Sequence, residues 1–397
     1  MKKIKTKLEK SEFIPYGRQD IRPQDIESVI DILNSDFITQ GPAVPVFEKK
    51  LCDYTGAKYS VAVNSCTSAL HIACLALDLG PGDILWTSPI TFVASVNCAL
   101  YCGANVDFVD IEPDTALMSI EKLKEKLEWA EKEGKLPKIV VPVHFAGQPC
   151  DMKEIYTLGQ HYNFKIIEDA AHAIGAKYQG NPVGNCHYSD ISVFSFHPVK
   201  IITTGEGGAS MTNNPIIYER MKVLRSHGIT RDPLVMRKQH EKSWYYEQID
   251  LGFNYRMTDI QAALGSSQIT RLDEYVLRRT DIAEWYDKQF EDISIIDPLS
   301  QKAERKSAHH LYVIKVISEK KIRDKVYEFL REKNIGVNLH YMPVYKHPYH
   351  QMKYTISKKN NAEHYFDRTL TLPIFQGLSN NHTNFVVDSL LEAVLSS

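Results

Sequence analysis

From about residue 24 to residue 215, short β-rich runs alternate with helical patterns, and this alternation constrains the fold more than any other feature of the chain. Helices are expected at 68–77, 119–133 and 151–162. Strands are expected within YSVAV (59–63), PGDILWTSP (81–89), ANVDFVDIE (104–112), KIVVPVHFAG (138–147) and FKIIEDAAHA (164–173). This order predicts an α/β fold with a mainly parallel sheet covered by helices on both faces. Binding sites in such sheets lie beyond the carboxyl ends of the strands.

The chain after residue 175 predicts a change of architecture. A hairpin is expected on the Gly-Asn-Pro turn of 176–185, followed by two antiparallel strands at 190–196 and 207–213. A long helix should begin after Thr258, which is in a capping position, and continue past Leu272 into a second domain. That domain is expected to be α+β. Its strands are expected at 309–317 and 336–343, and its helices at 321–334 and 384–397.

Composition and charge exclude several classes of protein. The 397 residues carry 47 Lys and Arg against 49 Asp and Glu, a formal net charge of −2, which argues against a nucleic-acid binder or a polybasic membrane anchor. The basic start, MKKIKTKLEKSEF, has no apolar stretch after it and is interpreted as a solvated leader. No run is apolar enough to span a membrane.

The cysteines point to a reducing compartment. There are seven, an odd number, at positions 52, 66, 74, 98, 102, 150 and 186, with no CxxC pair. They are expected to be reduced thiols in a cytoplasmic protein, and their spacing does not favour a metal site.

Two segments at predicted strand ends carry polar groups suited to a ligand. Asn64-Ser65-Cys66-Thr67-Ser68 lies between a strand and a helix, where free N–H groups and the helix dipole favour a phosphate. The alternative is an ordinary helix cap. Asp169, in Glu168-Asp169-Ala170-Ala171-His172, can hold a cationic ring nitrogen, supported by His172, or it can simply cap the next turn.

Two further segments add a lysine and an aromatic ring. Lys200 follows the apolar strand ending in Ser195, at the junction with a flexible loop, so its amine can enter a cleft; most lysines are merely solvated. Phe92 follows the turn WTSPI and can either stack on a planar ligand or pack in the core. Together, the phosphate cradle, aromatic ring, carboxylate and lysine occur in the order needed to hold pyridoxal 5′-phosphate.

These residues belong to a series of motifs that resembles the DegT/StrS family of sugar aminotransferases over nearly the whole chain. The motifs, in order, are YGRQ (16–19), FITQGP (37–42), NSCTSAL (64–70), EDAAH (168–172), SFHPVK (195–200), TGEGG (204–208), RSHG (225–228), GFNYR (252–256) and HYMPVY (340–345). The resemblance implies the fold type I architecture of pyridoxal-phosphate transferases, with a seven-stranded-type sheet in the large domain. It divides the chain into a segment at 1–23 that contributes to the substrate site, a large cofactor-binding domain at 24–265 and a small α+β domain at 266–397.

The resemblance also implies a role for each site residue. Lys200 would bind the cofactor's aldehyde covalently, Asp169 would pair with the pyridine nitrogen, His172 would lie near the ring oxygen and Phe92 would stack on the ring. Cys66, Thr67 and Ser195 would hold the phosphate, and Asn254 would reach it from the neighbouring subunit of a homodimer. The nucleotide-sugar pocket would be lined by Tyr16, Asp36, Phe37, Ile38, Thr39, Asn338, Leu339, His340 and Tyr341.

The implied reaction moves an amino group from L-glutamate to a nucleotide-linked keto sugar. The Tyr16 start, the SFHPVK form and the segment NLHYMPVY (338–345) are most similar to enzymes that aminate C4 of a UDP-linked 4-keto-6-deoxy-N-acetylhexosamine in pseudaminic acid biosynthesis. A GDP- or dTDP-linked sugar and amination at C3 stay open. Dehydratase relatives replace the lysine with His, so Lys200 argues against elimination. A non-enzymatic cofactor-binding regulator would need an added DNA-binding segment, and none is visible.

Overall fold

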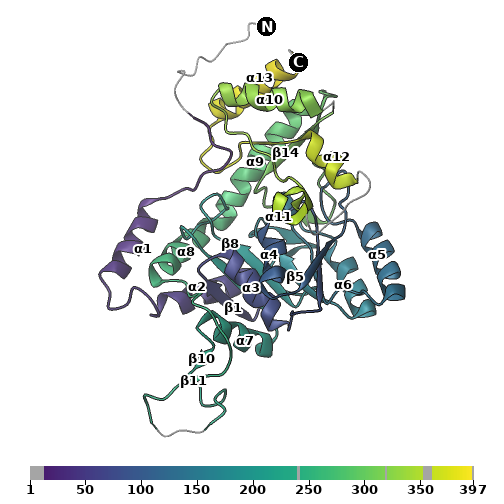
Figure 1. Cartoon of the computed structure of the whole chain (residues 1–397). Coiled ribbons are helices and arrows are strands. Elements are labelled where there is room, and N and C mark those ends of the chain that lie inside the picture. Colours follow the sequence, from purple (N-terminus) through teal and green to yellow (C-terminus); the bar gives the residue numbers. More distant parts are fainter. Residues whose placement is uncertain (1–12, 239–241, 318–319, 352–359, 396–397) are drawn as a thin grey trace.

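The computed structural model describes residues 13–238, 242–317, 320–351 and 360–395. A large part built on a seven-stranded sheet carries a smaller part with its own three-stranded sheet, which lies at the top of Figure 1. Residues 1–12 of the predicted leader, which comprises residues 1–13, lie outside the described residues. No helix within the described ranges is long and apolar enough to cross a membrane.

The large sheet has the strand order β1-β9-β8-β5-β4-β2-β3. Its strands are β1 (Tyr59–Val63), β2 (Ile84–Thr87), β3 (Asn105–Phe108), β4 (Ile139–Val141), β5 (Lys165–Asp169), β8 (Ile191–Ser195) and β9 (Gly208–Thr212). From β8 to β3 all neighbours are parallel, and β9 runs antiparallel to both β1 and β8. Because β5 and β8 are parallel, Asp169 and Ser195 end neighbouring strands at one edge of the sheet.

The two strands predicted after the parallel ones are antiparallel to each other, as expected, but β8 is parallel to β5 and so continues the parallel part of the sheet. The chain between Asp169 and Ile191 contains the short hairpin of β6 (Lys177–Tyr178) and β7 (Asn181–Pro182), which also pairs with β13 (Arg305–Lys306). This connection is long enough to return the chain to the opposite end of the sheet, so β8 enters parallel to β5. Only β9 is antiparallel, as predicted.

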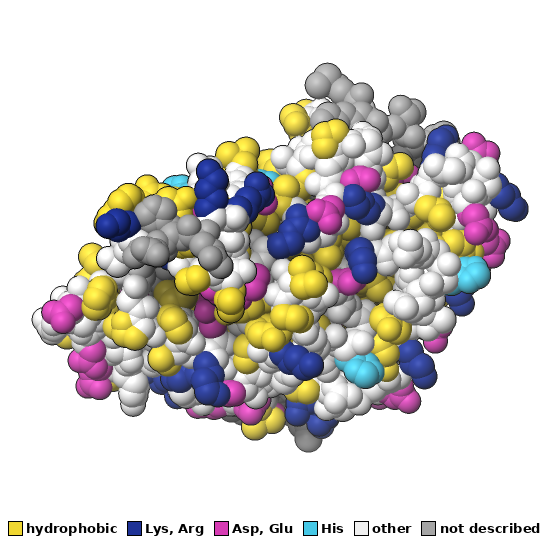
Figure 2. All heavy atoms as spheres, turned by 90° about the horizontal axis from the view of Figure 1, so that it is seen from below, with side chains coloured by type: hydrophobic (Ala, Val, Ile, Leu, Met, Phe, Trp, Pro, Cys, Tyr) yellow, Lys and Arg dark blue, Asp and Glu magenta, His cyan; other side chains and the backbone are white. Residues whose placement is uncertain are grey.

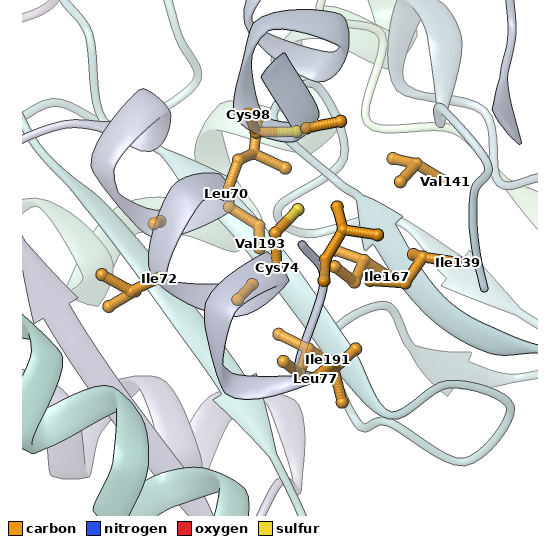
Figure 3. Close-up of a cluster of buried hydrophobic side chains, with 14 of the residues drawn as sticks. Leu70, Ile72, Cys74, Leu77, Cys98, Ile139, Val141, Ile167, Ile191 and Val193 are labelled. Atoms are coloured by element: carbon orange, nitrogen blue, oxygen red, sulfur yellow. The ribbon is translucent and has the colours of Figure 1, made fainter. Parts of the chain in front are cut away.

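Helices cover both faces of the sheet. They are α2 (Ala43–Thr55), α3 (Cys66–Ala76), α4 (Ala94–Tyr101), α5 (Ile120–Glu133), α6 (Met152–Tyr162), α7 (Pro215–Arg225) and α8 (Asp259–Gln268). On one face α3 and α4 pack on the sheet through Leu70, Cys74 and Cys98 against Ile167 and Val193 (Figure 3). All five residues of β8 are buried, as expected for a strand covered on both faces.

The predicted long helix after Thr258 is confirmed in two consecutive pieces. Thr258 caps α8 and forms a capping box with Gln261. A short turn at Ile269–Arg271 joins α8 to α9 (Leu272–Phe290), which runs from the large part into the small part (Figure 1). The helix α1 (Pro23–Leu33) packs against α8.

The small part is α+β, as predicted. Its sheet has the order β12-β14-β15, and all its pairings are antiparallel. Its elements are β12 (Ile296–Pro298), β14 (Tyr312–Val316), β15 (Thr369–Leu372), α10 (Lys320–Glu332), α11 (Pro348–Gln351), α12 (Asn361–Arg368) and α13 (Asn380–Leu395). The residue limits of the domains, 1–23, 24–265 and 266–397, stay a prediction.

The strand predicted at 336–343 does not form. Asn338 makes only an isolated antiparallel bridge to Thr371, and its own side chain accepts the N–H of Leu339 at 2.8 Å. That N–H is therefore unavailable to a strand ladder, and Pro343 has none to offer. The segment follows an irregular path instead.

A long excursion leaves the large part at the end opposite the small part. It is anchored by the two-residue strands β10 (Ile229–Thr230) and β11 (Glu247–Gln248) and projects downward in Figure 1. Figure 2 looks onto this side and shows hydrophobic side chains interspersed with charged ones. Leu234 and Leu251 are among the exposed hydrophobic residues there, with 94% and 76% of their surface accessible.

Candidate active site

A cavity of about 930 Å³ opens at the carboxyl ends of β5 and β8, facing the N-terminus of α3. The elements around it come from both parts of the molecule. The residues that line it include Tyr16, Cys66, Thr67, Phe92, Ser95, Asp169, His172, Ser195, Lys200, Asn338, Leu339, His340 and Tyr341. Most of the residues predicted from separate motifs are therefore brought together in one place.

Asp169 ends β5, and two groups of the protein hold its carboxylate. One carboxylate oxygen accepts the hydroxyl of Ser95 at 2.5 Å, and the other accepts the N–H of Ala171 at 3.1 Å. The Ser95 hydroxyl is in turn 2.7 Å from that of Thr91. The side chain is 5% exposed, so the carboxylate presents a fixed negative charge to the cavity.

The first turn of α3 forms a cradle for an anion. Ser65 caps the helix by accepting the N–H of Ser68 at 3.1 Å. The N–H groups of Cys66 and Thr67 belong to the first turn of the helix, so they have no acceptor within it. A Cβ on Gly208, which starts β9, would lie 2.6 Å from the Cys66 nitrogen, so only glycine leaves this approach open. These features fit a phosphate group.

Lys200 lies in the turn that follows β8, and its backbone N–H donates to the carbonyl of His197 at 2.9 Å. Burial lowers the pKa of its amine to about 8, and the opposing effects of Cys66 and Asp169 are smaller. The amine is 3.5 Å from Nε2 of His310. A buried lysine that loses its proton near neutral pH is a nucleophile.

Aromatic and imidazole rings border the rest of the cavity. Nε2 of His172 is 3.3 Å from the hydroxyl of Tyr341, and the two rings are stacked with centroids 6.2 Å apart. Phe92 is 59% exposed, which is unusual for a phenylalanine and leaves its face free for a planar ligand. Its ring centroid lies 6.3 Å from that of Tyr341.

The irregular segment at 338–341 forms the wall on the side of the small part. Asn338, Leu339, His340 and Tyr341 all line the cavity, as predicted. Nδ1 of His340 is 2.9 Å from the hydroxyl of Thr371, and its ring packs 5.3 Å from that of Tyr16. Burial, followed by Lys200, lowers the pKa of His340 to about 3, so this wall carries no charge from His340 at neutral pH.

Two sets of predicted residues are not brought to this cavity within one chain. Asp36, Phe37, Ile38 and Thr39 are exposed, and the carbonyl of Ile38 accepts the N–H of Asp259. Asn254 is exposed and bridges to Ser226 beside the base of the β10–β11 excursion. Neither set is among the residues that line the cavity in the described chain, so their roles stay predictions.

Three side chains near the chemistry were not predicted from the sequence. Thr91 and Ser95 are four residues apart and meet at the start of α4, a spacing that can be recognised in hindsight. His310 follows another histidine before β14. It is 110 residues from Lys200 in the sequence, so no local sequence pattern links the two residues.

The cavity fits pyridoxal phosphate on three independent observations. The first turn of α3 and Gly208 form an anion cradle. The Asp169 carboxylate is anchored where a pyridinium nitrogen needs a buried negative charge. Nδ1 of His172 is buried without a hydrogen-bond partner in the described chain, and Lys200 supplies an amine for the aldehyde.

Comparison with known proteins agrees with this geometry. Residues 19–391 match the model of the DegT/DnrJ/EryC1/StrS aminotransferase family. The chain is 37% identical over 378 residues to a UDP-4-amino-4,6-dideoxy-N-acetyl-beta-L-altrosamine transaminase from Campylobacter jejuni, covering 95% of this chain and 96% of the relative. It is 33% identical over 393 residues to the UDP-4-amino-4-deoxy-L-arabinose–oxoglutarate aminotransferase of Shewanella sediminis, covering 97% and 99%.

Solved structures share the whole architecture. Helicobacter pylori PseC, an aminotransferase of pseudaminic acid biosynthesis, superposes with a TM-score of 0.89 at 29% identity and covers 97% of this chain and 100% of its own. The PLP form of Spr1654 from Streptococcus pneumoniae superposes with a TM-score of 0.86 at 29% identity, covering 97% and 99%.

Proposed function

Since the chain belongs to the DegT/DnrJ/EryC1/StrS aminotransferase family, we propose that it transfers an amino group from L-glutamate to C4 of a UDP-linked 4-keto-6-deoxy-N-acetylhexosamine. It is a sugar aminotransferase whose cofactor is pyridoxal 5′-phosphate. The finer assignment of substrate is supported by the relatives from Campylobacter jejuni and Helicobacter pylori. The proposed pathway is the biosynthesis of pseudaminic acid or of a related amino sugar of surface glycans.

The observation that carries the proposal is the convergence of Lys200, Asp169 and the first turn of α3 on one cavity. When bound, the cofactor supplies an electron sink for the negative charge that develops on the donor's α-carbon. Lys200 would bond the cofactor's aldehyde and, when its amine is free, would move a proton from the donor's α-carbon. Asp169 keeps a proton on the ring nitrogen, and it is rigid because Ser95 and the Ala171 N–H hold it.

The remaining residues position the cofactor and the sugar. Cys66, Thr67 and Ser195 would hold the phosphate, His172 would lie near the ring oxygen and Phe92 would stack on the ring. We assign Tyr16, Asn338, Leu339, His340 and Tyr341 to the sugar pocket, since they line the cavity beyond Lys200. We further propose a homodimer in which each subunit completes the site of its partner. The residues that would do so are Asn254 and the segment of Asp36, Phe37, Ile38 and Thr39. They are exposed and do not line the cavity of their own chain in the described residues.

One experiment tests the substrate. Cofactor-loaded protein is incubated with L-glutamate and a panel of UDP-, GDP- and dTDP-linked 4-keto-6-deoxy sugars, and products are identified by mass and the aminated carbon by NMR. The expected result is a 4-amino product from the UDP-linked N-acetylhexosamine. Acceptance of only the GDP or dTDP compounds, or amination at C3, would overturn the UDP-sugar proposal and leave the transamination chemistry intact.

A further inference from the structure

The imidazole of His310 lies directly against the amine of Lys200. His310 comes from the turn before β14, in the small part of the molecule, while Lys200 follows β8 in the large part. Nε2 of His310 is 3.5 Å from Nζ of Lys200, and the histidine is 4% exposed. Lys200 lines the cavity, whereas His310 is not among the lining residues in the described chain. The imidazole therefore contacts the lysine without itself being among the lining residues of the described chain.

The turn that carries His310 is fixed by a buried arginine. Nη1 of Arg279, on α9, donates to the carbonyls of His309 and His310, both at 3.2 Å, and to that of Ile374 at 3.0 Å. Arg279 is fully buried, and its Nε and Nη2 have no hydrogen-bond partner among the described residues. Burying a cation without a carboxylate costs free energy. Arg279 is nevertheless buried, and two of the three carbonyls to which it donates belong to the turn of His309 and His310, which indicates that the position of this turn is important.

A second contact fixes the same turn from the large part. The N–H of Ala308 donates to the carbonyl of Gly147 at 3.0 Å, and that of Leu311 to the carbonyl of Ala146 at 3.3 Å. A Cβ on Gly147 would lie 2.9 Å from the nitrogen of His309 and 3.0 Å from that of His310. The two backbones are therefore in direct contact, and His310 cannot move away from Lys200 without disrupting both anchors.

Burial keeps the imidazole of His310 neutral. It lowers the pKa of His310 well below the ordinary value, and the neighbouring Lys200, His172, Arg279 and His340 act in the same direction. The ring packs on that of His172 with centroids 4.3 Å apart, and Nδ1 has no hydrogen-bond partner among the described residues. Lys200 is thus the only hydrogen-bond partner of the ring in the described chain, and a neutral Nε2 can accept from its amine.

We propose that His310 is a positioning residue that holds the Lys200 amine at the edge of the cavity whenever that amine is not bonded to the cofactor. The proposal rests on the proposed function, in which each half-reaction requires the amine to leave the cofactor, move a proton and return. Throughout that interval the amine has no covalent anchor. Catalytic hydrogen bonds often shorten when substrate binds, and the 3.5 Å between Nζ of Lys200 and Nε2 of His310 is within the range from which they do so.

The test follows cofactor capture by the apoenzyme, which requires neither glutamate nor sugar. The amine of Lys200 condenses with the aldehyde of added pyridoxal phosphate, forming one C=N bond and releasing one water. The rate is read from absorbance between pH 6 and pH 10, and borohydride reduction with peptide mapping identifies the bonded lysine. Wild type is compared with His310→Phe, which keeps the bulk and removes the acceptor, and with His310→Gln, which keeps an acceptor near the position of Nε2. Melting temperatures are measured for all three.

The Phe variant is expected to lower the limiting capture rate at high pH about tenfold, since the amine is no longer oriented. The pH at which the capture rate reaches half of its limiting value should also decrease, because the charged form of the Lys200 amine loses the hydrogen-bond acceptor on His310. The Gln variant should restore both values to within about threefold and half a pH unit of wild type. A lower melting temperature with an unchanged midpoint and rate would overturn the proposal, as would a Gln variant no better than Phe.

The result separates this proposal from the proposed function. If wild type captures the cofactor at Lys200 and the Phe variant is impaired, His310 has the stated role even when no sugar of the panel is aminated. If wild type bonds the cofactor at another lysine, the role of His310 is overturned together with the assignment of Lys200.

Discussion

The hydroxyl of Ser95 donates to the carboxylate of Asp169 at 2.5 Å, joining the start of α4 to the end of β5. Because the serine has one proton and gives it to the acid, Thr91, 2.7 Å away, must be the donor in its contact with Ser95. The three side chains therefore form a chain of hydrogen bonds that ends on the acid. This arrangement fixes the direction in which the carboxylate faces the cavity.

Ser95→Ala should weaken the function of Asp169 without removing its charge. A hydrogen bond to a charged group contributes about 1.5–3 kcal/mol, so kcat should fall about 10- to 100-fold. Thr91→Val is the matched control, since it removes only the outer hydroxyl and should cost less than tenfold. Steady-state kinetics with L-glutamate would check both variants. Equal activity of Ser95→Ala and wild type would show that the carboxylate does not need this anchor.

The alternation of strands and helices was sufficient to predict the sheet and the edge at which the site forms. Those signals are local, because each strand and helix is determined by its own run of residues. The direction of β8 relative to β5 was not predicted, since direction depends on how a connection of more than 20 residues crosses the sheet between Asp169 and Ile191. The segment at 336–343 has β-rich composition, yet Asn338 and Pro343 prevent a ladder.

The site residues that the sequence missed are defined by contacts between distant segments. Asp169 ends a recognisable apolar strand and Lys200 follows another in the turn after Ser195, and the parallel direction of β8 brings them to the same edge of the sheet. His310 reaches Lys200 only because α9 and the Gly147 turn hold its backbone in place. No spacing in the sequence encodes that contact. Likewise, Asn254 is exposed and does not line the cavity of its own chain, and its place in the site of a partner subunit stays a prediction.

Lys200→Ala should abolish turnover, because no other lysine of the described residues lines the cavity to bond the aldehyde and move the proton. The purified variant should also lose the absorbance band of the covalently bound cofactor, while Asp169 and the α3 cradle still allow noncovalent binding. Absorbance spectra and product formation would check this. An unchanged spectrum and rate would refute the assignment of Lys200.

Gly208→Ala should weaken cofactor binding at the phosphate. The new Cβ would lie 2.6 Å from the nitrogen and 2.7 Å from the Cα of Cys66, so either β9 or the first turn of α3 must shift. We expect the dissociation constant for pyridoxal phosphate to rise at least about tenfold, since the loss of one charge-assisted hydrogen bond has this effect. Gly80→Ala is the matched control, because a Cβ there meets nothing within 4 Å. Similar affinities of the two variants, measured by titration of apoenzyme, would contradict the cradle.

Cofactor capture by wild-type apoenzyme should accelerate as the pH rises through about 8. Burial lowers the pKa of Lys200 to about 8, and only the unprotonated amine attacks the aldehyde. The unprotonated fraction then rises about a hundredfold between pH 6 and pH 9 and levels off above that. An ordinary lysine, with a pKa near 10.4, would give a rate that still increases about sevenfold between pH 9 and pH 10. Stopped-flow absorbance across this range distinguishes the two cases.

Asn254 provides the test of a shared site. It is exposed at the base of the β10–β11 excursion and bridges Ser226, so its side chain is available to a second copy of the chain but not to its own cavity. If Asn254 completes the partner's phosphate site, Lys200→Ala and Asn254→Ala subunits should each be inactive or weak alone. Mixed dimers should regain activity, because one of their two sites combines an intact lysine with an intact asparagine.

Differently tagged subunits, refolded together and purified through both tags, allow specific activity to be measured on heterodimers only. Recovery to about half of the wild-type value is expected from this geometry, in which one site of each mixed dimer is intact. Heterodimers no more active than the parent proteins would show that each chain completes its own site.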